Sequence, residues 1–162
     1  EELGMKGSGK DENKRAPMYW SKDGNAEGMC KGPADMDDFR MKFDSLEEQQ
    51  EDPDSIYNYV KQVIRVRNQN PVIARGTTAY LEQYSGEQCF ALTRSYEGSN
   101  LLLLGNTSAE AVSVDLTGLT VGGTTAEELV LLGELYTGEE TAERAGTVVT
   151  LPAYSILILG EE

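Results

Sequence analysis

The side chains that could do chemistry in this chain are mostly carboxylates. Its 162 residues include 28 acidic and 14 basic ones and no histidine. A pair of carboxylates could cleave a glycosidic bond, but nothing in the sequence singles out a pair, and the clustered acids are interpreted as solvated loop residues. Without histidine there is no Ser-His or Cys-His nucleophile and no His-ligated metal. We therefore expect no catalytic residue among the acids, which cluster at Asp35, Asp37, Asp38, Glu47 and Glu48.

Two short runs resemble ligand-binding loops but lack their full spacing. The run 7–10 (Gly-Ser-Gly-Lys) has neither the Walker spacing nor a preceding strand. The run 23–25 (Asp-Gly-Asn) begins like a calcium loop, but the EF-hand spacing is absent. Cys30 and Cys89 have no metal-ligand spacing and are interpreted as free thiols in a reducing compartment. We expect no cofactor and no metal site.

The charge of the chain excludes two classes of partner. The net charge is −14, and residues 76–162 hold only Arg94 and Arg144 as bases. Phosphate recognition depends on Lys and Arg, so neither nucleic acid nor an anionic membrane surface is expected as a partner. No apolar run approaches the roughly 20 residues that a membrane-spanning helix needs.

The segment from Arg15 to Trp20 is the most informative one, and it holds the only tryptophan. Arg15 offers a fixed charge and a planar fork that suits carboxylates and sugar hydroxyls. Pro17 stiffens the loop, and Met18 and Trp20 are expected to anchor it against an apolar surface. Two interpretations stay open: a loop that an aromatic side chain holds in place, or a hydrogen-bond donor at the rim of a carbohydrate site.

One long helix is predicted to follow an irregular region. Residues 1–50 show no sustained period, and short helical turns are expected only around 36–43. The helix is predicted at 53–69, since Asp52 can cap it and Pro53 suits its first position. An apolar stripe of this kind is usually core, so the helix must lie on the following β domain or on a part of the protein outside this chain. The stripe consists of Ile56, Val60, Val63 and Ile64.

From residue 77 onward the pattern changes to short strands separated by turns, which predicts an antiparallel β-sandwich or barrel. Two runs, 101–104 and 156–159, are apolar on both faces and are predicted to be central strands. The chain is therefore expected to divide near residue 75. The predicted strands are 77–84, 88–96, 100–105, 111–116, 128–136, 146–151 and 154–159.

Three motifs in order resemble glycoside hydrolase family 13, the α-amylase family, and most of all its oligo-1,6-glucosidase and α-glucosidase members. Residues 1–5 (Glu-Glu-Leu-Gly-Met) resemble the family's Gly-Glu-Glu-Ile-Gly-Met. Residues 15–20 resemble Arg-x-Pro-Met-Gln-Trp, with Tyr19 in place of Gln. Residues 55–59 (Ser-Ile-Tyr-Asn-Tyr), continuing to Val66-Arg67, resemble the last helix of the catalytic barrel. The closing β-sandwich of that family, domain C, matches residues 77–162 in pattern alone.

The resemblance implies that residues 1–75 are the end of a (β/α)8 barrel and that 76–162 are the sandwich. The family's catalytic carboxylates would lie upstream of residue 1, so this chain would be a non-catalytic C-terminal fragment, inactive alone, of a retaining α-glucan-cleaving hydrolase. The start Glu1-Glu2-Leu3, without methionine, is expected of an excised or processed chain. Arg15 would contact substrate in the intact parent only. The parent's barrel would be the main partner, and the open helix face could also form a dimer.

Compartment and sugar binding by the sandwich stay open at this point. The sparse cysteines and the oligo-glucosidase resemblance favour the cytoplasm. An alternative function is a carbohydrate-binding β-sandwich module, in which exposed aromatic rings stack on sugar rings. Its candidate residues are Tyr80, Tyr84, Phe90, Tyr96, Tyr136 and Tyr154.

Overall fold

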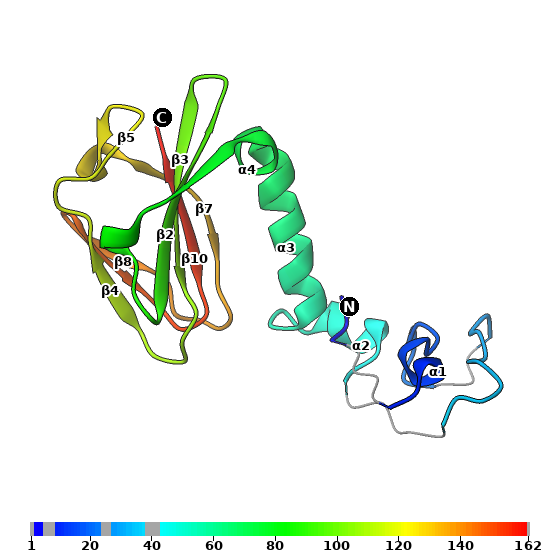
Figure 1. Cartoon of the computed structure of the whole chain (residues 1–162). Helices are drawn as coiled ribbons and strands as arrows, with labels where there is room; N and C mark the ends of the chain where they lie inside the picture. The colour runs from blue at the N-terminus through cyan, green and yellow to red at the C-terminus, as the bar shows by residue number, and fades with distance from the viewer. Residues whose placement is uncertain (1, 5–8, 24–26, 38–42, 162) are drawn as a thin grey trace. The chain divides into compact units, whose positions relative to one another are not determined.

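The computed structural model describes residues 2–4, 9–23, 27–37 and 43–161 (Figure 1). The chain divides into two compact units, Glu1–Lys61 and Gln62–Glu162. Several predicted features lie wholly or partly outside the described residues. They are the motif at 1–5, the runs 7–10 and 23–25, the helical turns at 36–43, and Asp38.

The first unit contains short helices and irregular segments, as the lack of periodicity predicts. Helix α1 (Asp11–Lys14) and helix α2 (Leu46–Glu51) were not predicted. Helix α2 has a sequence signal, because Ser45 and Glu48 form a capping box in which each side chain bonds the other residue's backbone N–H. Six residues are too few to show a helical period, which explains why the pattern alone misses this helix.

The predicted long helix is confirmed, but its start is wrong by three residues. Helix α3 spans Ile56–Gln69. Asp52 ends α2 instead of beginning α3, and the Ser55 Oγ accepts the backbone N–H of Asn58 at the start of α3. Helix α3 ends at Gln69, and Pro71 opens a separate short helix, α4 (Pro71–Arg75), at a position where a missing N–H costs nothing.

The second unit is an antiparallel β-sandwich, as predicted. Its larger sheet has the order β1 (Thr77–Tyr80), β2 (Cys89–Tyr96), β3 (Ser99–Asn106), β10 (Ile156–Gly160) and β7 (Val130–Leu135). A second sheet has the order β4 (Val112–Asp115), β9 (Val148–Leu151) and β8 (Glu143–Ala145). β5 (Thr120–Val121) and β6 (Thr124–Thr125) form a two-stranded ribbon. β5, β6 and β8 were not predicted, since two or three residues carry no alternation.

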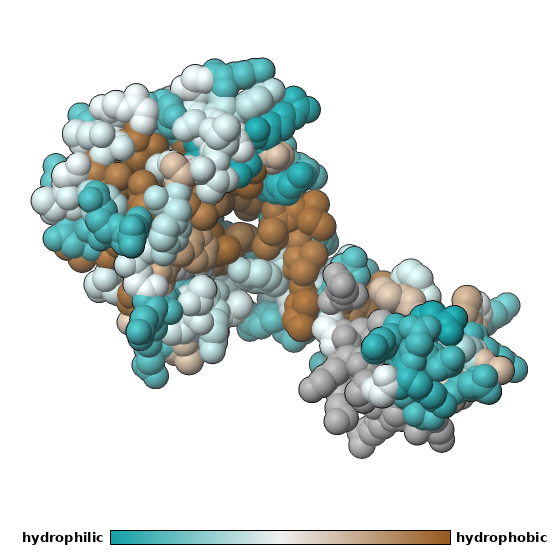
Figure 2. All heavy atoms as spheres, viewed as in Figure 1, coloured by the Kyte–Doolittle hydropathy of each residue, from teal (hydrophilic) through white to brown (hydrophobic). Residues whose placement is uncertain are grey.

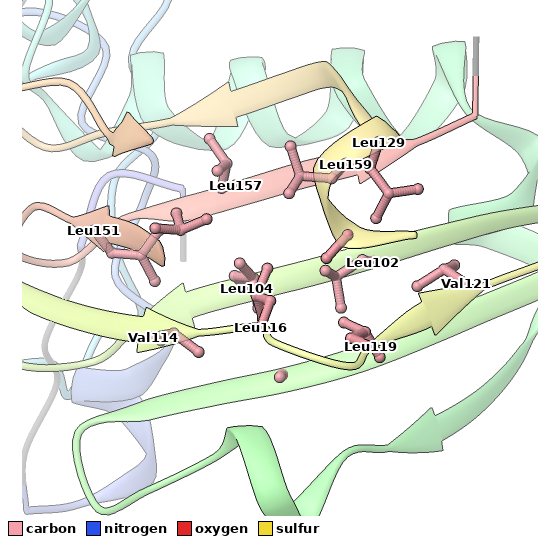
Figure 3. Packing of buried hydrophobic residues seen from close by; sticks show 13 residues of the cluster. Leu102, Leu104, Val114, Leu116, Leu119, Val121, Leu129, Leu151, Leu157 and Leu159 are labelled. Atoms are coloured by element: carbon pink, nitrogen blue, oxygen red, sulfur yellow. The ribbon is translucent and has the colours of Figure 1, made fainter. Parts of the chain in front are cut away.

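The two central strands follow the sequence prediction closely. β3 and β10 are neighbours in the middle of the large sheet. One face of these strands lines the main core between the sheets, where Leu102 and Leu104 are completely buried (Figure 3). The opposite face buries Leu101 and Ile158 against Val72 of α4. These two strands are therefore apolar on both sides because helices cover the outer face of the sheet.

Among the described residues, no helix is long and apolar enough to cross a membrane.

Cys30 is exposed and Cys89 is half-buried, and both are free thiols.

Candidate functional site

The loop that presents Arg15 is fixed to the start of helix α2. The backbone N–H groups of Leu46 and Glu47 donate to the carbonyl oxygens of Tyr19 (2.9 Å) and Trp20 (3.1 Å). The first N–H groups of a helix have no partner inside the helix, so the loop satisfies two donors that would otherwise need water. The loop and the helix therefore stabilise each other.

Tyr19 anchors the loop, whereas Met18 and Trp20 do not. The Tyr19 ring packs edge-on against Phe43, with centroids 5.8 Å apart. Met18 and Trp20 are 37% and 51% exposed. The expectation that these two would anchor the loop is therefore wrong for this chain alone. The physical reason is the backbone pairing of the loop with α2. This pairing turns Tyr19 toward Phe43 and leaves the side chains of Met18 and Trp20 exposed.

Arg15 lies directly after helix α1 and pairs with acids of that helix. Its Nε is 3.0 Å from Asp11 Oδ2, and an Nη is 3.8 Å from Glu12 Oε1. The Arg15 side chain remains 59% exposed. Exposed pairs of this kind contribute about 0–1 kcal/mol, so a carboxylate or a sugar hydroxyl could replace either acid at little cost. The guanidinium is thus available as a hydrogen-bond donor.

Several acids of the first unit have structural partners. The Asp37 carboxylate accepts a hydrogen bond from Asn13 Nδ2, the Asp37 backbone N–H donates to Asn13 Oδ1, and an ion pair joins Asp37 to Lys10 at 2.7 Å. These contacts, the Asn13 hydrogen bond first, hold the pKa of Asp37 below its ordinary value. Glu47 accepts from Ser21. Asp37 is an exposed loop acid, as expected, and Glu47 is exposed as well but lies in helix α2 instead of a loop.

Glu48 is the second half of the α2 capping box and also pairs with the loop. It accepts from the Ser45 hydroxyl at 2.8 Å, and its other oxygen lies 3.1 Å from Lys22 Nζ. The Ser45 hydrogen bonds, more than Lys22, lower the pKa of Glu48. Across the described ranges, no group of three or more His, Cys, Asp or Glu residues could hold a metal ion.

The structure adds one residue that sequence reasoning missed, Gln49. Its side chain is buried, and its Nε2 donates to the carbonyl oxygens of Leu3 (2.9 Å) and Asp44 (2.8 Å). Its Oε1 accepts the N–H of Tyr57 at the start of α3. Gln49 therefore joins three segments of the first unit, and no local pattern marks it.

Helix α3 has apolar side chains on more than one side. Val66 packs with the apolar cluster on the outer face of the large sheet. It also lies close to Gly133 of β7, where an added Cβ atom would be only 3.3 Å from the Val66 side chain. Ile56 and Ile64 are 51% and 52% exposed. Figure 2 shows hydrophobic residues along this helix at the surface. The predicted stripe is thus partly open, because Ile56 and Ile64 are exposed while Val60 and Val63 are half-buried.

Most aromatic residues of the sandwich have structural contacts. The Tyr84 hydroxyl donates to Thr117 O, and the Tyr136 hydroxyl donates to Glu134 and accepts from the Ala142 N–H. Tyr96 packs in the outer cluster, and the Phe90 ring covers Gly105. Two of the six candidate rings remain mainly exposed: Tyr80 and Tyr154.

Solved structures of α-amylase-family enzymes have the same fold. Amy13B of Eubacterium rectale is 39% identical, with a TM-score of 0.89, over 99% of this chain and 30% of its own. An α-amylase from H. orenii is 25% identical, with a TM-score of 0.70, over 99% of this chain and 31% of its own. A variant of the trehalulose synthase MutB bound to Tris is 24% identical, with a TM-score of 0.66, over 91% and 25%. This last likeness concerns the fold alone.

This chain spans only about a quarter to a third of the length of these structures. No protein-family model and no curated protein matches it.

Proposed function

We propose that this chain is the C-terminal part of a glycoside hydrolase of family 13 that acts on α-glucans, close to its oligo-1,6-glucosidase and α-glucosidase members. Residues 1–75 complete the catalytic barrel of the parent, and residues 76–162 form the sandwich that packs on it. The observation that carries the proposal is the 39% identity to Amy13B over 99% of this chain, within 30% of that enzyme.

The two apolar sides of helix α3 support this arrangement. Ile64 and Val66 are two residues apart, so they project from nearly opposite sides of the helix. A helix that is apolar on opposite sides is typical of an element buried between two layers. The sheet covers the Val66 side. The barrel of the parent covers the Ile64 side.

Arg15 is the substrate-contacting residue of this part of the enzyme. Its exposed guanidinium is weakly held by Asp11 and Glu12. A sugar hydroxyl or a barrel carboxylate can take their place without a large loss of free energy. The catalytic carboxylates belong to the preceding part of the parent, so the 162-residue chain has no hydrolytic activity of its own.

The test expresses this chain as one protein with the segment that its gene encodes before residue 1, called the joined protein below. The joined protein should hydrolyse p-nitrophenyl α-glucoside, and Arg15→Ala should lower kcat/KM at least tenfold, about 1.4 kcal/mol of transition-state stabilisation. Lys14→Ala is the matched control, since it removes a neighbouring exposed cation of α1. Turnover by the chain alone that is lost on replacing one of its acids would contradict the proposal.

A further inference from the structure

Arg15 follows a helix that is too short to hold its own position. Helix α1 has only four residues, and the Arg15 N–H donates to the carbonyl oxygen of Glu12 at 3.2 Å. The two acids that pair with the guanidinium, Asp11 and Glu12, belong to the same short helix. A helix of this length is not stable by itself in water. Contacts from outside α1 must therefore fix the position of Arg15.

A buried amide side chain connects α1 to a segment that is distant in sequence. Asn13 is only 6% exposed. Its Nδ2 donates to Asp37 Oδ2 at 2.8 Å, and its Oδ1 accepts the Asp37 backbone N–H at 3.0 Å. The other carboxylate oxygen of Asp37 lies 2.7 Å from Lys10 Nζ. Lys10 precedes the first residue of α1 and Asn13 lies in its second half, so one carboxylate holds the helix near both of its ends.

The segment 32–37 also reaches the chain on the other side of Arg15. A Cβ atom added to Gly32 would lie 3.4 Å from Pro17 Cδ and 2.7 Å from Met36 Sδ, so both side chains lie close to Gly32. The Met36 N–H donates to the carbonyl oxygen of Pro33 at 3.0 Å, which closes a turn within the segment. The segment therefore contacts the chain both before and after Arg15.

We propose that Asp37 is a positioning residue for Arg15: its hydrogen bonds with Asn13 fix helix α1 and thereby set where the guanidinium meets a sugar. This role rests on the proposed function, in which Arg15 contacts substrate. Asp37 touches no substrate and acts only through Arg15. The Asn13 bonds carry the role more than the Lys10 ion pair, because an exposed ion pair of this kind contributes little.

The first test measures hydrolysis of p-nitrophenyl α-glucoside by the joined protein. Asp37→Ala should lower kcat/KM about fivefold or more, because a small misplacement of a substrate-binding group is costly. The matched control is Asp35→Ala, which removes an exposed acid of the same segment and should change kcat/KM less than about twofold. Asp37→Asn keeps an oxygen that can accept from Asn13 and should retain most of the activity. Equal losses in all three variants would overturn the proposal.

A double-mutant comparison separates positioning of Arg15 from a general effect on stability. In the Arg15→Ala background, Asp37→Ala should change kcat/KM less than about twofold, because a residue that acts through Arg15 has no further effect once Arg15 is gone. A loss of the same size in both backgrounds would show that Asp37 serves the fold alone and would contradict the proposal.

Amide exchange gives a readout that does not depend on activity. In the joined protein, Asp37→Ala should speed the exchange of the peptide 11–16 about fivefold or more, whereas Asp35→Ala should leave it unchanged. Mass spectrometry measures both. Unchanged exchange in Asp37→Ala would overturn the positioning role whatever the activity. A joined protein without hydrolysis would contradict the proposed function, and the exchange result would still decide whether Asp37 fixes α1.

Discussion

At the scale of single residues, buried polar side chains organise the first unit. Gln49 bonds the backbone of Leu3, Asp44 and Tyr57, which belong to three separate segments. A polar group of this kind stabilises only while all its partners stay satisfied.

Replacing Gln49 by alanine should destabilise the first unit by about 2–3 kcal/mol, because buried backbone groups lose their partners. Amide exchange of Tyr57 and thermal unfolding would measure this. Gln50→Ala is the matched control, since Gln50 is the exposed neighbour in the same helix. Similar effects of both variants would contradict the role given to Gln49.

Glu48 makes the capping box of α2 sensitive to acid. Its pKa is lowered, chiefly by Ser45, from an ordinary value near 4.5. A carboxylate with a depressed folded pKa stabilises the fold above its unfolded pKa and loses that contribution as the pH falls through its folded pKa. The melting temperature should therefore decrease as the pH is lowered below about 4.5. In the Glu48→Gln variant the melting temperature should depend less on pH in this range. Equal acid sensitivity of both proteins would rule the mechanism out.

At the scale of elements, α3 is the part of the chain with two different environments. Val66 is packed on the large sheet, and Ile64 is open. Val66→Ala should cost about 1–2 kcal/mol through lost packing, whereas Ile64→Ala should cost less than about 0.5 kcal/mol. Urea unfolding of the two variants checks this. A large loss at Ile64 would mean that this side is covered within the chain.

The open side of α3 should also drive self-association when nothing covers it, since exposed apolar patches mark interaction surfaces. Light scattering of the 162-residue chain should show a concentration-dependent rise in mass, and Ile56→Ser with Ile64→Ser should reduce it. In the joined protein, where the barrel covers this side of α3, the wild-type sequence should not associate through it. Association that persists in the double variant would place the interface elsewhere.

At the scale of the whole molecule, the sandwich has a large apolar core of its own. Leu104 is fully buried between the sheets, while Leu132 on β7 is 39% exposed. Leu104→Ala should lower the free energy of unfolding by about 2–5 kcal/mol, and Leu132→Ala should have little effect. Denaturant unfolding followed by exchange of the β3 amides would separate the two. Comparable losses would mean that the core does not dominate stability.

Long, strongly patterned elements could be predicted, and short or polar ones could not. The runs 101–104 and 156–159 predict central strands because apolar side chains on both faces exclude an edge position. Helices of four to six residues and strands of two or three carry no period, so α1, α2, α4, β5, β6 and β8 were missed. Arg15 was found from its motif, but its place beside Asp11 and Glu12 was not predicted.

The sequence by itself determined the long strands of the sandwich and the position of the helical stripe, because these depend on spacing along the chain; the role of Arg15 stays a proposal. Only the tertiary structure decided that Tyr19 anchors the loop, that Gln49 joins three segments and that Asn13 bonds Asp37. Such contacts arise between residues distant in sequence. Their energies come from burial and geometry, which no local pattern encodes.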